Sequence, residues 1–239
     1  SRGRFVAGDN ARFSYDARSG LTDVVTTDAI TATGGDDSIA LGQKDLATDL
    51  GLQVVCGGMG ADQIVVRSVA RSQDILFGDN GELHRKALGY GVLTALSTAA
   101  NLGGDDIIRT GKGDKRIVGG FGNDTIVAET VREGSLAERV LVLGDAGQLV
   151  YDVAGSELLQ KVESTDTGFG GDDQIRVGDG DITAIGGYGR DSVQVDSREN
   201  AYRILAGDNA QLLFAGEQDV SKQAASLTSA LTLDQTAVT

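Results

Sequence analysis

The sequence predicts an all-β fold, a parallel, β-helix-like solenoid of repeated units with hairpin insertions. Composition is the first reason, because the 239 residues include 35 glycines and no proline, and only 5% are aromatic. Leucine, isoleucine and valine are frequent between the glycines, which is typical of short strands joined by tight turns. The other reasons are landmarks that recur at spacings of 62 to 70 residues and a nine-residue unit rich in glycine and aspartate. Repeats of this length indicate stacked units, since one unit cannot bury its apolar face alone.

Three landmarks recur in a fixed order along the chain. A Gly-Asp-Asn turn or its variant begins at Gly8, Gly78, Gly144 and Gly207. A GGDD element follows at Gly34, Gly103 and Gly170, and a longer glycine-rich element follows at Gly57, Gly119 and Gly186. These landmarks divide the single solenoid, 1–239, into units of approximately 8–77, 78–143 and 144–206 and a partial unit 207–239. We expect the chain to be a segment of a longer array, with neighbouring repeats as its partners.

The stretch after each Gly-Asp-Asn turn predicts a β-hairpin. In 147–166, LVYD and ELLQKVES flank a turn centred on Ala154-Gly155, and 11–28 repeats the pattern. The equivalent stretch 82–102 is less regular, and its last part is also compatible with a short helix. The tail 221–239 has the character of the polar connecting part of another repeat.

Nine-residue units follow the hairpin stretch, most clearly in 101–127. The apolar residue at the eighth place falls at Ile108, Ile117 and Ile126, nine residues apart. The third unit has Ile175, Ala184 and Val193 at the matching places. A six-residue turn followed by three extended residues, with one side chain pointing inward, predicts parallel strands wound into a coil.

The segments GGMGADQIV (57–65), GGFGNDTIV (119–127) and GGYGRDSVQ (186–194) resemble the haemolysin-type calcium-binding (RTX) repeat family. The resemblance covers about a third of the chain. It implies a parallel β-roll in which two nonapeptides complete one turn, with Ca²⁺ between loops stacked on the same side. It also implies export by type I secretion. The chain departs from the family's pattern because only three nonapeptides occur before a hairpin intervenes, and Asn101-Leu102 replaces an opening Gly-Gly.

Aspartate occupies the end of alternate turns. Asp106 and Asp124 flank Lys115, and Asp173 and Asp191 flank Ile182. This alternation agrees with two turns per coil and metal on one side only. The first unit carries a seven-residue insertion around QKDLATDLG (43–51), in the middle nonapeptide on the side that we predict to be free of metal.

We therefore predict one Ca²⁺ per complete unit, three in all, each held by a pair of aspartates. The pairs are Asp37 with Asp62, Asp106 with Asp124, and Asp173 with Asp191. Neighbouring main-chain carbonyls are expected to complete six to eight oxygens at about 2.3–2.6 Å. The carbonyl candidates are Gly35, Gly57, Met59, Gly104, Gly119, Phe121, Gly171, Gly186 and Tyr188.

Other interpretations of these residues remain open. The six aspartates are also compatible with tight turns in which each carboxylate accepts a hydrogen bond from a backbone amide. For Asp9, Asp79, Asp145 and Asp208 in the Gly-Asp-Asn turns, an Asx turn is favoured over a second metal shared by Asp179 or Asp181 with Asp208. His84 is the only histidine and is expected on a hairpin surface, and Cys56, the only cysteine, in the core.

The charge balance limits the classes of binding partner that we expect. With 21 basic and 35 acidic residues the formal net charge is −14, which disfavours nucleic acid and anionic lipid and favours cations. No apolar run approaches the ~20 residues of a membrane span, so membrane insertion is not expected. No segment resembles a signal peptide.

These observations predict a calcium-binding structural repeat module of a large secreted or cell-surface bacterial protein of adhesin or matrix type. The module is expected to fold and stiffen on binding extracellular Ca²⁺ and to have no enzymatic activity. The sequence does not identify its adhesive ligand. The alternative is an accessory or catalytic β-helix module of a polysaccharide-acting enzyme. Such an enzyme needs an acid and a basic residue converging outside the calcium turns, and no recurring set of this kind is visible.

Overall fold

The computed structural model describes residues 4–17, 20–28, 34–42, 51–69, 72–85, 91–130, 132–133, 136–152, 158–196, 201–215 and 226–233. Within these ranges all regular secondary structure is β, as the sequence predicted. No helix in these ranges is long and apolar enough to cross a membrane. The predicted turn at 154–155 and the insertion at 43–50 lie outside the described residues.

Two parallel sheets and one antiparallel sheet make up the fold. Sheet A is parallel and contains, in order, β1 (Arg4–Ala7), β5 (Leu52–Cys56), β7 (Gln73–Phe77), β11 (Asp114–Val118), β15 (Arg139–Leu143), β19 (Asp181–Gly187) and β21 (Arg203–Asp208). Sheet C is also parallel and contains β4 (Ser38–Gly42), β6 (Gln63–Arg67), β10 (Ile107–Thr110), β12 (Thr125–Ala128), β18 (Gln174–Val177) and β20 (Ser192–Val195).

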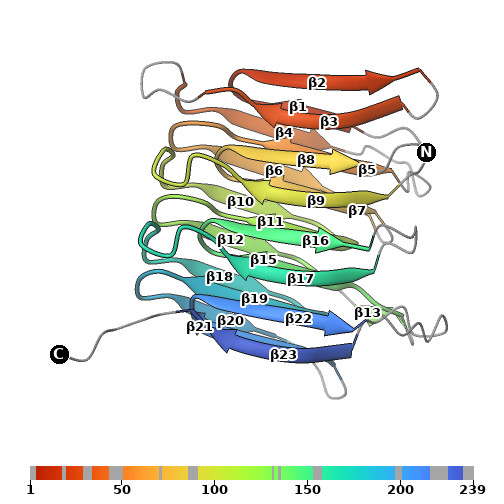
Figure 1. The fold of residues 1–239 in the computed structure, drawn as a ribbon, viewed down its shortest axis with the longest axis vertical. Coiled ribbons are helices and arrows are strands. Elements are labelled where there is room, and N and C mark those ends of the chain that lie inside the picture. The colour runs from red at the N-terminus through yellow and green to blue at the C-terminus, as the bar shows by residue number, and fades with distance from the viewer. Residues whose placement is uncertain are drawn as a thin grey trace.

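Sheet B consists of antiparallel hairpins. Its strands are β2 (Ala11–Asp16), β3 (Gly20–Thr26), β8 (Gly81–Arg85), β9 (Val92–Ser97), β16 (Gly147–Tyr151), β17 (Leu159–Ser164), β22 (Ala210–Ala215) and β23 (Ser226–Thr232). A two-stranded ribbon, β13 (Arg132–Glu133) with β14 (Leu136–Ala137), lies outside these sheets. The strands of each sheet follow one another along the long axis of the molecule, from β2 at one end to β23 at the other (Figure 1).

The chain alternates between two routes after leaving sheet A. A glycine turn leads from β5, β11 and β19 directly into sheet C. A Gly-Asp turn leads from β1, β7, β15 and β21 into a hairpin of sheet B, and after the first three hairpins a GGDD element leads on into sheet C. Each strand of sheet C leads back to a strand of sheet A, in the case of β12 through the β13–β14 ribbon, so the turns at the ends of the sheet A strands form a single row.

Sheet A lies between two apolar cores. In β7, Ile75 and Phe77 belong to the cluster shared with sheet B, whereas Leu76 belongs to the cluster shared with sheet C. Because sheet A is covered on both faces, strands such as β15 (RVLVL) are almost continuous apolar runs. The strands of sheets B and C have one outward face and alternate along the chain. In β18, for example, Ile175 and Val177 are buried, whereas Gln174 and Arg176 are exposed.

Most predicted elements occur where the sequence placed them. Ile108, Ile117 and Ile126 are all fully buried in the core between sheets A and C, with Ile117 on sheet A and the other two on sheet C. The predicted hairpins in 11–28 and 147–166 are β2–β3 and β16–β17.

One alternative for the hairpin segments is excluded. The described part of 82–102 contains no helix, since Val92–Ser97 is strand β9 and pairs with both β8 and β16. Pairing on both sides satisfies the backbone of β9 and overrides its mixed local pattern. The described part of the tail agrees with its interpretation as the connecting part of another repeat, since Ser226–Thr232 pairs with β22 as the second strand of a hairpin.

Candidate metal centre

The six aspartates of the glycine turns lie at the same edge of sheet C. Each of them immediately precedes a strand of that sheet, as Asp62 precedes β6 and Asp106 precedes β10. In a parallel sheet the starting ends of all strands lie along one edge, so the aspartates follow one another from strand to strand. We call this row the aspartate ladder: Asp37, Asp62, Asp106, Asp124, Asp173 and Asp191.

One hydrogen bond repeats at every step of the ladder. The backbone N–H of each aspartate donates to Oδ1 of the next, at 2.7 Å for Asp37 to Asp62 and 2.8 Å for Asp106 to Asp124. The same bond joins aspartates of different units, at 2.7 Å for Asp62 to Asp106 and 2.8 Å for Asp124 to Asp173. Asp173 to Asp191 completes the row at 2.9 Å. The pairs that the sequence predicted are therefore adjacent, but they are not separate pairs.

The second carboxylate oxygen of the ladder residues is in a different environment. Oδ2 is buried and has no hydrogen-bond partner in Asp62, Asp106, Asp124, Asp173 and Asp191. Backbone amides therefore account for one oxygen of each carboxylate and leave the other unsatisfied. Burying a polar oxygen without a partner is costly, which makes these five atoms the outstanding polar feature of the edge.

A glycine carbonyl lies beside each of these Oδ2 atoms. A Cβ built on Gly57 would overlap both Oδ2 of Asp62 and the carbonyl oxygen of Gly78. A Cβ on Gly119 would likewise overlap Oδ2 of Asp124 and the carbonyl of Gly144. The same arrangement surrounds Gly8, Gly78, Gly144 and Gly186. Glycine is required at these positions because the oxygens of two neighbouring turns occupy the space of a side chain.

The carboxylates of the Gly-Asp-Asn turns connect neighbouring turns. The N–H of Met59 donates to Oδ2 of Asp9 at 2.7 Å, and the N–H groups of Phe121 and Tyr188 donate to Asp79 and Asp145. The N–H of Gly104 also donates to Oδ1 of Asp79, at 3.1 Å. These bonds reach other turns, so they hold the row of turns together where the sequence predicted local Asx turns.

The alternative metal site at the Gly-Asp-Asn turns is contradicted by the register. Asp208 is level with Gly187 at the end of β19, whereas Asp181 is the first residue of that strand and accepts a hydrogen bond from Tyr202 N–H at 3.1 Å. Asp179 and Asp181 therefore lie at the opposite end of sheet A from Asp208. Because β19 and β21 run parallel, a residue at the start of β19 cannot meet a residue at the end of β21.

Burial raises the pKa values of the buried acids along this edge. Desolvation raises the pKa of Asp62 to about 7 and the pKa values of Asp106 and Asp173 to about 8. Burial, reinforced by the charges of Asp106 and Asp173, raises the pKa of Asp124 well above its usual range. The edge thus carries buried acids whose ionised forms need a compensating positive charge.

The predicted carbonyl candidates divide into two groups. The carbonyls of Gly57, Gly119 and Gly186 face the ladder, in the spaces beside Gly8, Gly78 and Gly144. The carbonyls of Gly35, Gly104 and Gly171 lie in a second stack, where they contact Gly60, Gly122 and Gly189. For Met59, Phe121 and Tyr188 the structure shows the N–H group, bound to an aspartate, as the engaged atom.

The carbonyls of Gly78, Gly144 and Gly207 also face the ladder and were missed from the sequence. A signal was present, because the run of apolar residues that precedes Gly57 and Gly119 also precedes these three glycines. Within the described ranges no three acidic, histidine or cysteine side chains gather around one point. The oxygens that each step offers are carboxylate oxygens together with main-chain carbonyls.

His84 and Cys56 lie where the sequence placed them. His84 is on strand β8, and its Nδ1 lies 2.8 Å from Oδ1 of Asp23 on the neighbouring hairpin. Cys56 is buried in the core between sheets A and B, and burial raises the pKa of its thiol to about 12. Cys56 is therefore a small core residue, and its thiol is not a nucleophile because burial disfavours the thiolate.

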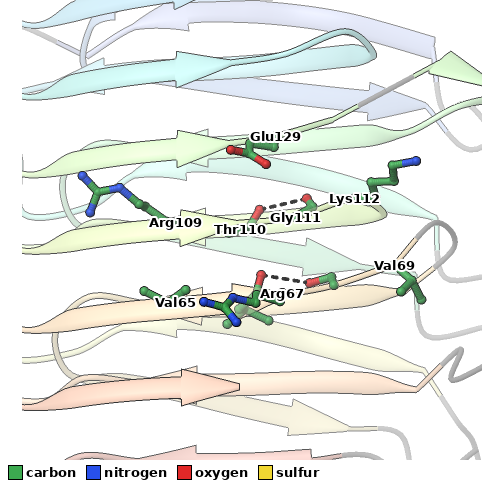
Figure 2. Close-up of a pocket in the computed structure, with 10 residues that line it drawn as sticks. Val65, Arg67, Val69, Arg109, Thr110, Gly111, Lys112 and Glu129 are labelled. Carbon is green, nitrogen blue, oxygen red and sulfur yellow. Dashed lines mark hydrogen bonds between the residues drawn. The ribbon is translucent and has the colours of Figure 1, made fainter. Parts of the chain in front are cut away.

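A hollow on the outer face of sheet C brings one acid close to several basic residues. Figure 2 shows Glu129, Arg109, Lys112 and Arg67 around it, on β6, β10 and the residues that follow β10 and β12. Sequence inspection did not reveal this grouping because the residues are up to 62 positions apart (67 to 129). The hollow lies towards the end of the sheet C strands, away from the aspartate ladder at their beginning.

Comparison of the chain with known protein families, curated proteins and solved structures found no match in any of the three.

Proposed function

We propose that the chain is a calcium-binding structural repeat module with a parallel, β-roll-like or β-helix-like solenoid fold. The five buried Oδ2 atoms without partners support the proposal most directly, because each faces a glycine carbonyl of a neighbouring turn. Carboxylate and carbonyl oxygens are hard ligands, and a cluster of them suits Ca²⁺. A divalent cation also supplies the positive charge that the buried carboxylates lack.

The repeating ladder favours one ion per step over one ion per unit. The step between Asp62 and Asp106 has the same hydrogen bond, the same unsatisfied Oδ2 and the same glycine carbonyl as the steps within a unit. We therefore revise the expected number from three Ca²⁺ ions to five. A pairwise arrangement would require the steps between units to differ, and they do not.

Calcium binding in this arrangement is coupled to folding. Without a cation, stacking of the turns brings ionised carboxylates together in a dry environment, which opposes folding at neutral pH. With Ca²⁺ bound, the ion links the turns on both sides of a step, and its binding free energy adds to that of folding. The module would therefore be weakly folded at low calcium and stiff at the millimolar calcium of an extracellular medium.

We further propose that the module belongs to a large secreted or cell-surface bacterial protein of adhesin or matrix type, with neighbouring repeats as its partners. The resemblance of the nonapeptides to secreted calcium-binding repeats supports this location, and so does the net charge of −14, which favours cations over polyanions. Type I secretion of the unfolded chain from a low-calcium cytosol agrees with folding on arrival. The adhesive ligand is not part of the proposal.

Bound calcium counted on the desalted protein tests the proposal. Element analysis by mass spectrometry is expected to give five Ca²⁺ per chain, with a gain of β signal in circular dichroism during the titration. Three ions per chain would favour isolated pairs. No bound calcium, or no change in the spectrum and in thermal unfolding, would reject the calcium module.

The alternative function is a polysaccharide-acting module. The hollow on sheet C is the place where this alternative can be tested. Glu129, Arg109 and Lys112 line one hollow, a grouping of an acid with basic residues that the sequence did not reveal. If the alternative holds, cleavage or binding of an acidic polysaccharide should be lost in Glu129→Gln and in Arg109→Ala. The calcium count should be unchanged in both variants, which separates the two functions.

A further inference from the structure

A buried ion pair lies at the end of sheet A remote from the glycine turns. Asp74 on β7 and Lys115 on β11 are direct partners in the register of the two strands. Both side chains are 0% exposed. Asp74 lies on the same face of its strand as Leu76, and Lys115 on the same face as Ile117, so both point into the core between sheets A and C.

The contacts of this pair hold an amine against a carboxyl group. Nζ of Lys115 lies 2.7 Å from Oδ2 of Asp74 and also donates to the carbonyl of Lys112. The hydroxyl of Ser68 donates to the same Oδ2. The side-chain amide of Gln53 donates to Oδ1 at 3.0 Å. Both oxygens of the carboxyl group therefore accept hydrogen bonds, which draws electron density away from the carbon between them.

Two further carboxyl groups act on the lysine. The charges of Glu138 and Asp114 both raise the pKa of Lys115, although desolvation has the larger effect and lowers it overall. Asp114 is bound by Arg139, at 2.7 Å from its Oδ2, and also accepts the Arg139 N–H at 2.9 Å. Glu138 is buried and its charge acts on Lys115, so we assign it the exchange of a proton with the amine.

We propose that Lys115 and Asp74 condense to form an intramolecular isopeptide bond. The neutral amine of Lys115 attacks the carboxyl carbon of Asp74, Gln53 stabilises the oxyanion that develops on Oδ1, and Ser68 hydrogen-bonds Oδ2, which departs. Glu138 takes a proton from the nitrogen and returns it to the departing hydroxyl group. A C–N bond forms, a C–O bond breaks, and one water molecule leaves. No oxidant, reductant or co-reactant is needed.

The surroundings favour this reaction over a persistent ion pair. A buried ammonium and carboxylate lose their hydration, and transfer of one proton between them gives the neutral amine and acid that react. The register of β7 and β11 fixes the two groups next to each other, which supplies a high effective concentration. The amide product keeps Oδ1 as its carbonyl oxygen, which still accepts the Gln53 hydrogen bond.

The bond would join two successive units. Asp74 lies in the unit 8–77 and Lys115 in the unit 78–143, so the link ties neighbouring strands of the central sheet together. Unlike the ladder, it would not depend on calcium, and it would limit how far the two units separate under load or when calcium is withdrawn. The inference stands independently of the calcium proposal.

Intact-mass spectrometry of the full chain tests the bond. The folded wild-type protein is expected to weigh one water molecule less than its sequence. Digestion should release a branched peptide that contains Asp74 and Lys115. A wild-type mass equal to the sequence mass, in protein whose β11 amides are protected from hydrogen exchange, would overturn the proposal.

Three variants identify the roles of the residues. Lys115→Arg keeps the charge without a reactive amine and is expected to show the full sequence mass. Glu138→Gln keeps the ion pair without the proton acceptor and should show a large loss of the cross-linked fraction. Asp114→Asn is the matched control and should cross-link like the wild type; loss of the bond there but not in Glu138→Gln would contradict the role of Glu138.

Discussion

The two aspartates of each GGDD element differ in burial. Asp105 and Asp106 are adjacent, yet the first is exposed and the second is buried with an unsatisfied Oδ2. Asp105 accepts hydrogen bonds from Asn123, on the next turn of the same row. A single position in the turn thus decides whether a carboxylate is a surface group or part of the ladder.

Asp124→Asn should remove two calcium ions, because Asp124 takes part in two steps of the ladder. Asparagine keeps an oxygen to accept the N–H of Asp106, and its NH₂ group can donate to the carbonyl of Gly144. We therefore expect lower stability with calcium but equal or higher stability without it. A saturated site at a hundredfold of its Kd contributes about 2.7 kcal/mol, which sets the scale of the loss.

The matched control for this variant is Asp105→Asn, which removes the same charge from an exposed position. It should leave the calcium count unchanged. Element analysis and urea unfolding, each with calcium and with a chelator, measure both effects. Loss of one ion in Asp124→Asn would instead support isolated pairs, and no loss would exclude Asp124 as a ligand.

Gly119→Ala should destabilise the protein although alanine is a small residue. The added Cβ would overlap Oδ2 of Asp124 and the carbonyl of Gly144, and overpacking of this kind costs about 1–3 kcal/mol. Gly168→Ala is the control, since no atom lies within 4 Å of the position of its Cβ. Thermal unfolding of the two variants should separate them clearly; equal melting temperatures would contradict the tight space beside Gly119.

At the scale of elements, hairpins of sheet B are joined across units by polar pairs as well as by backbone bonds. His84 on β8 is the register partner of Asp23 on β3. The hydrogen bond to Asp23 raises the pKa of His84, and Glu82 at 3.3 Å adds to the shift. The pKa of Asp23 is lowered, mainly by the same bond.

The stability of this contact should fall as the pH rises. Because the folded-state pKa of His84 lies above its ordinary value of 6.5, the contribution is complete below that value and is lost as the pH rises through the folded-state pKa. Both side chains are partly exposed, so the effect should be less than about 1 kcal/mol. Urea unfolding across this range should show a steeper loss of stability in the wild type than in His84→Gln, because the ladder aspartates with raised pKa values contribute the same slope to both proteins.

At the scale of the whole molecule, the aspartate ladder extends along all the strands of sheet C. Each of the three complete units adds two ladder aspartates at the same end of sheet C, so their repulsion accumulates from unit to unit while both apolar cores grow alongside. Stability of the stack is then set by the balance of core burial against charge, and a cation at the edge shifts that balance.

Calcium should stabilise the whole stack more than magnesium at equal concentration. Ca²⁺ accepts six to eight oxygens in flexible geometry, whereas Mg²⁺ demands a near-ideal octahedron and retains water that the buried ladder cannot accommodate. Sodium chloride should raise the melting temperature of the calcium-free protein only by screening. Thermal unfolding with each salt and with a chelator tests this order; equal effects of Ca²⁺ and Mg²⁺ would contradict it.

The sequence by itself determined the local features of the protein. Glycine turns, the nine-residue spacing of Ile108, Ile117 and Ile126, and the hairpins each depend on residues close together in the chain, and all are present. The alternation of aspartate with Lys115 and Ile182 also indicated correctly that acids would gather on one side, since the intervening residues lie on sheet A. These features follow from backbone conformation and side-chain periodicity.

Only the tertiary structure decided how the repeats meet. Stacking of units places Asp62 against Asp106 as closely as Asp37 against Asp62, which turned three pairs into a continuous ladder. It also placed the Gly-Asp-Asn turns in the same row as the glycine-rich turns and brought Lys115 to Asp74. Contacts of this kind depend on the register between parallel strands, which is fixed by the packing of both cores and is not encoded at any one position.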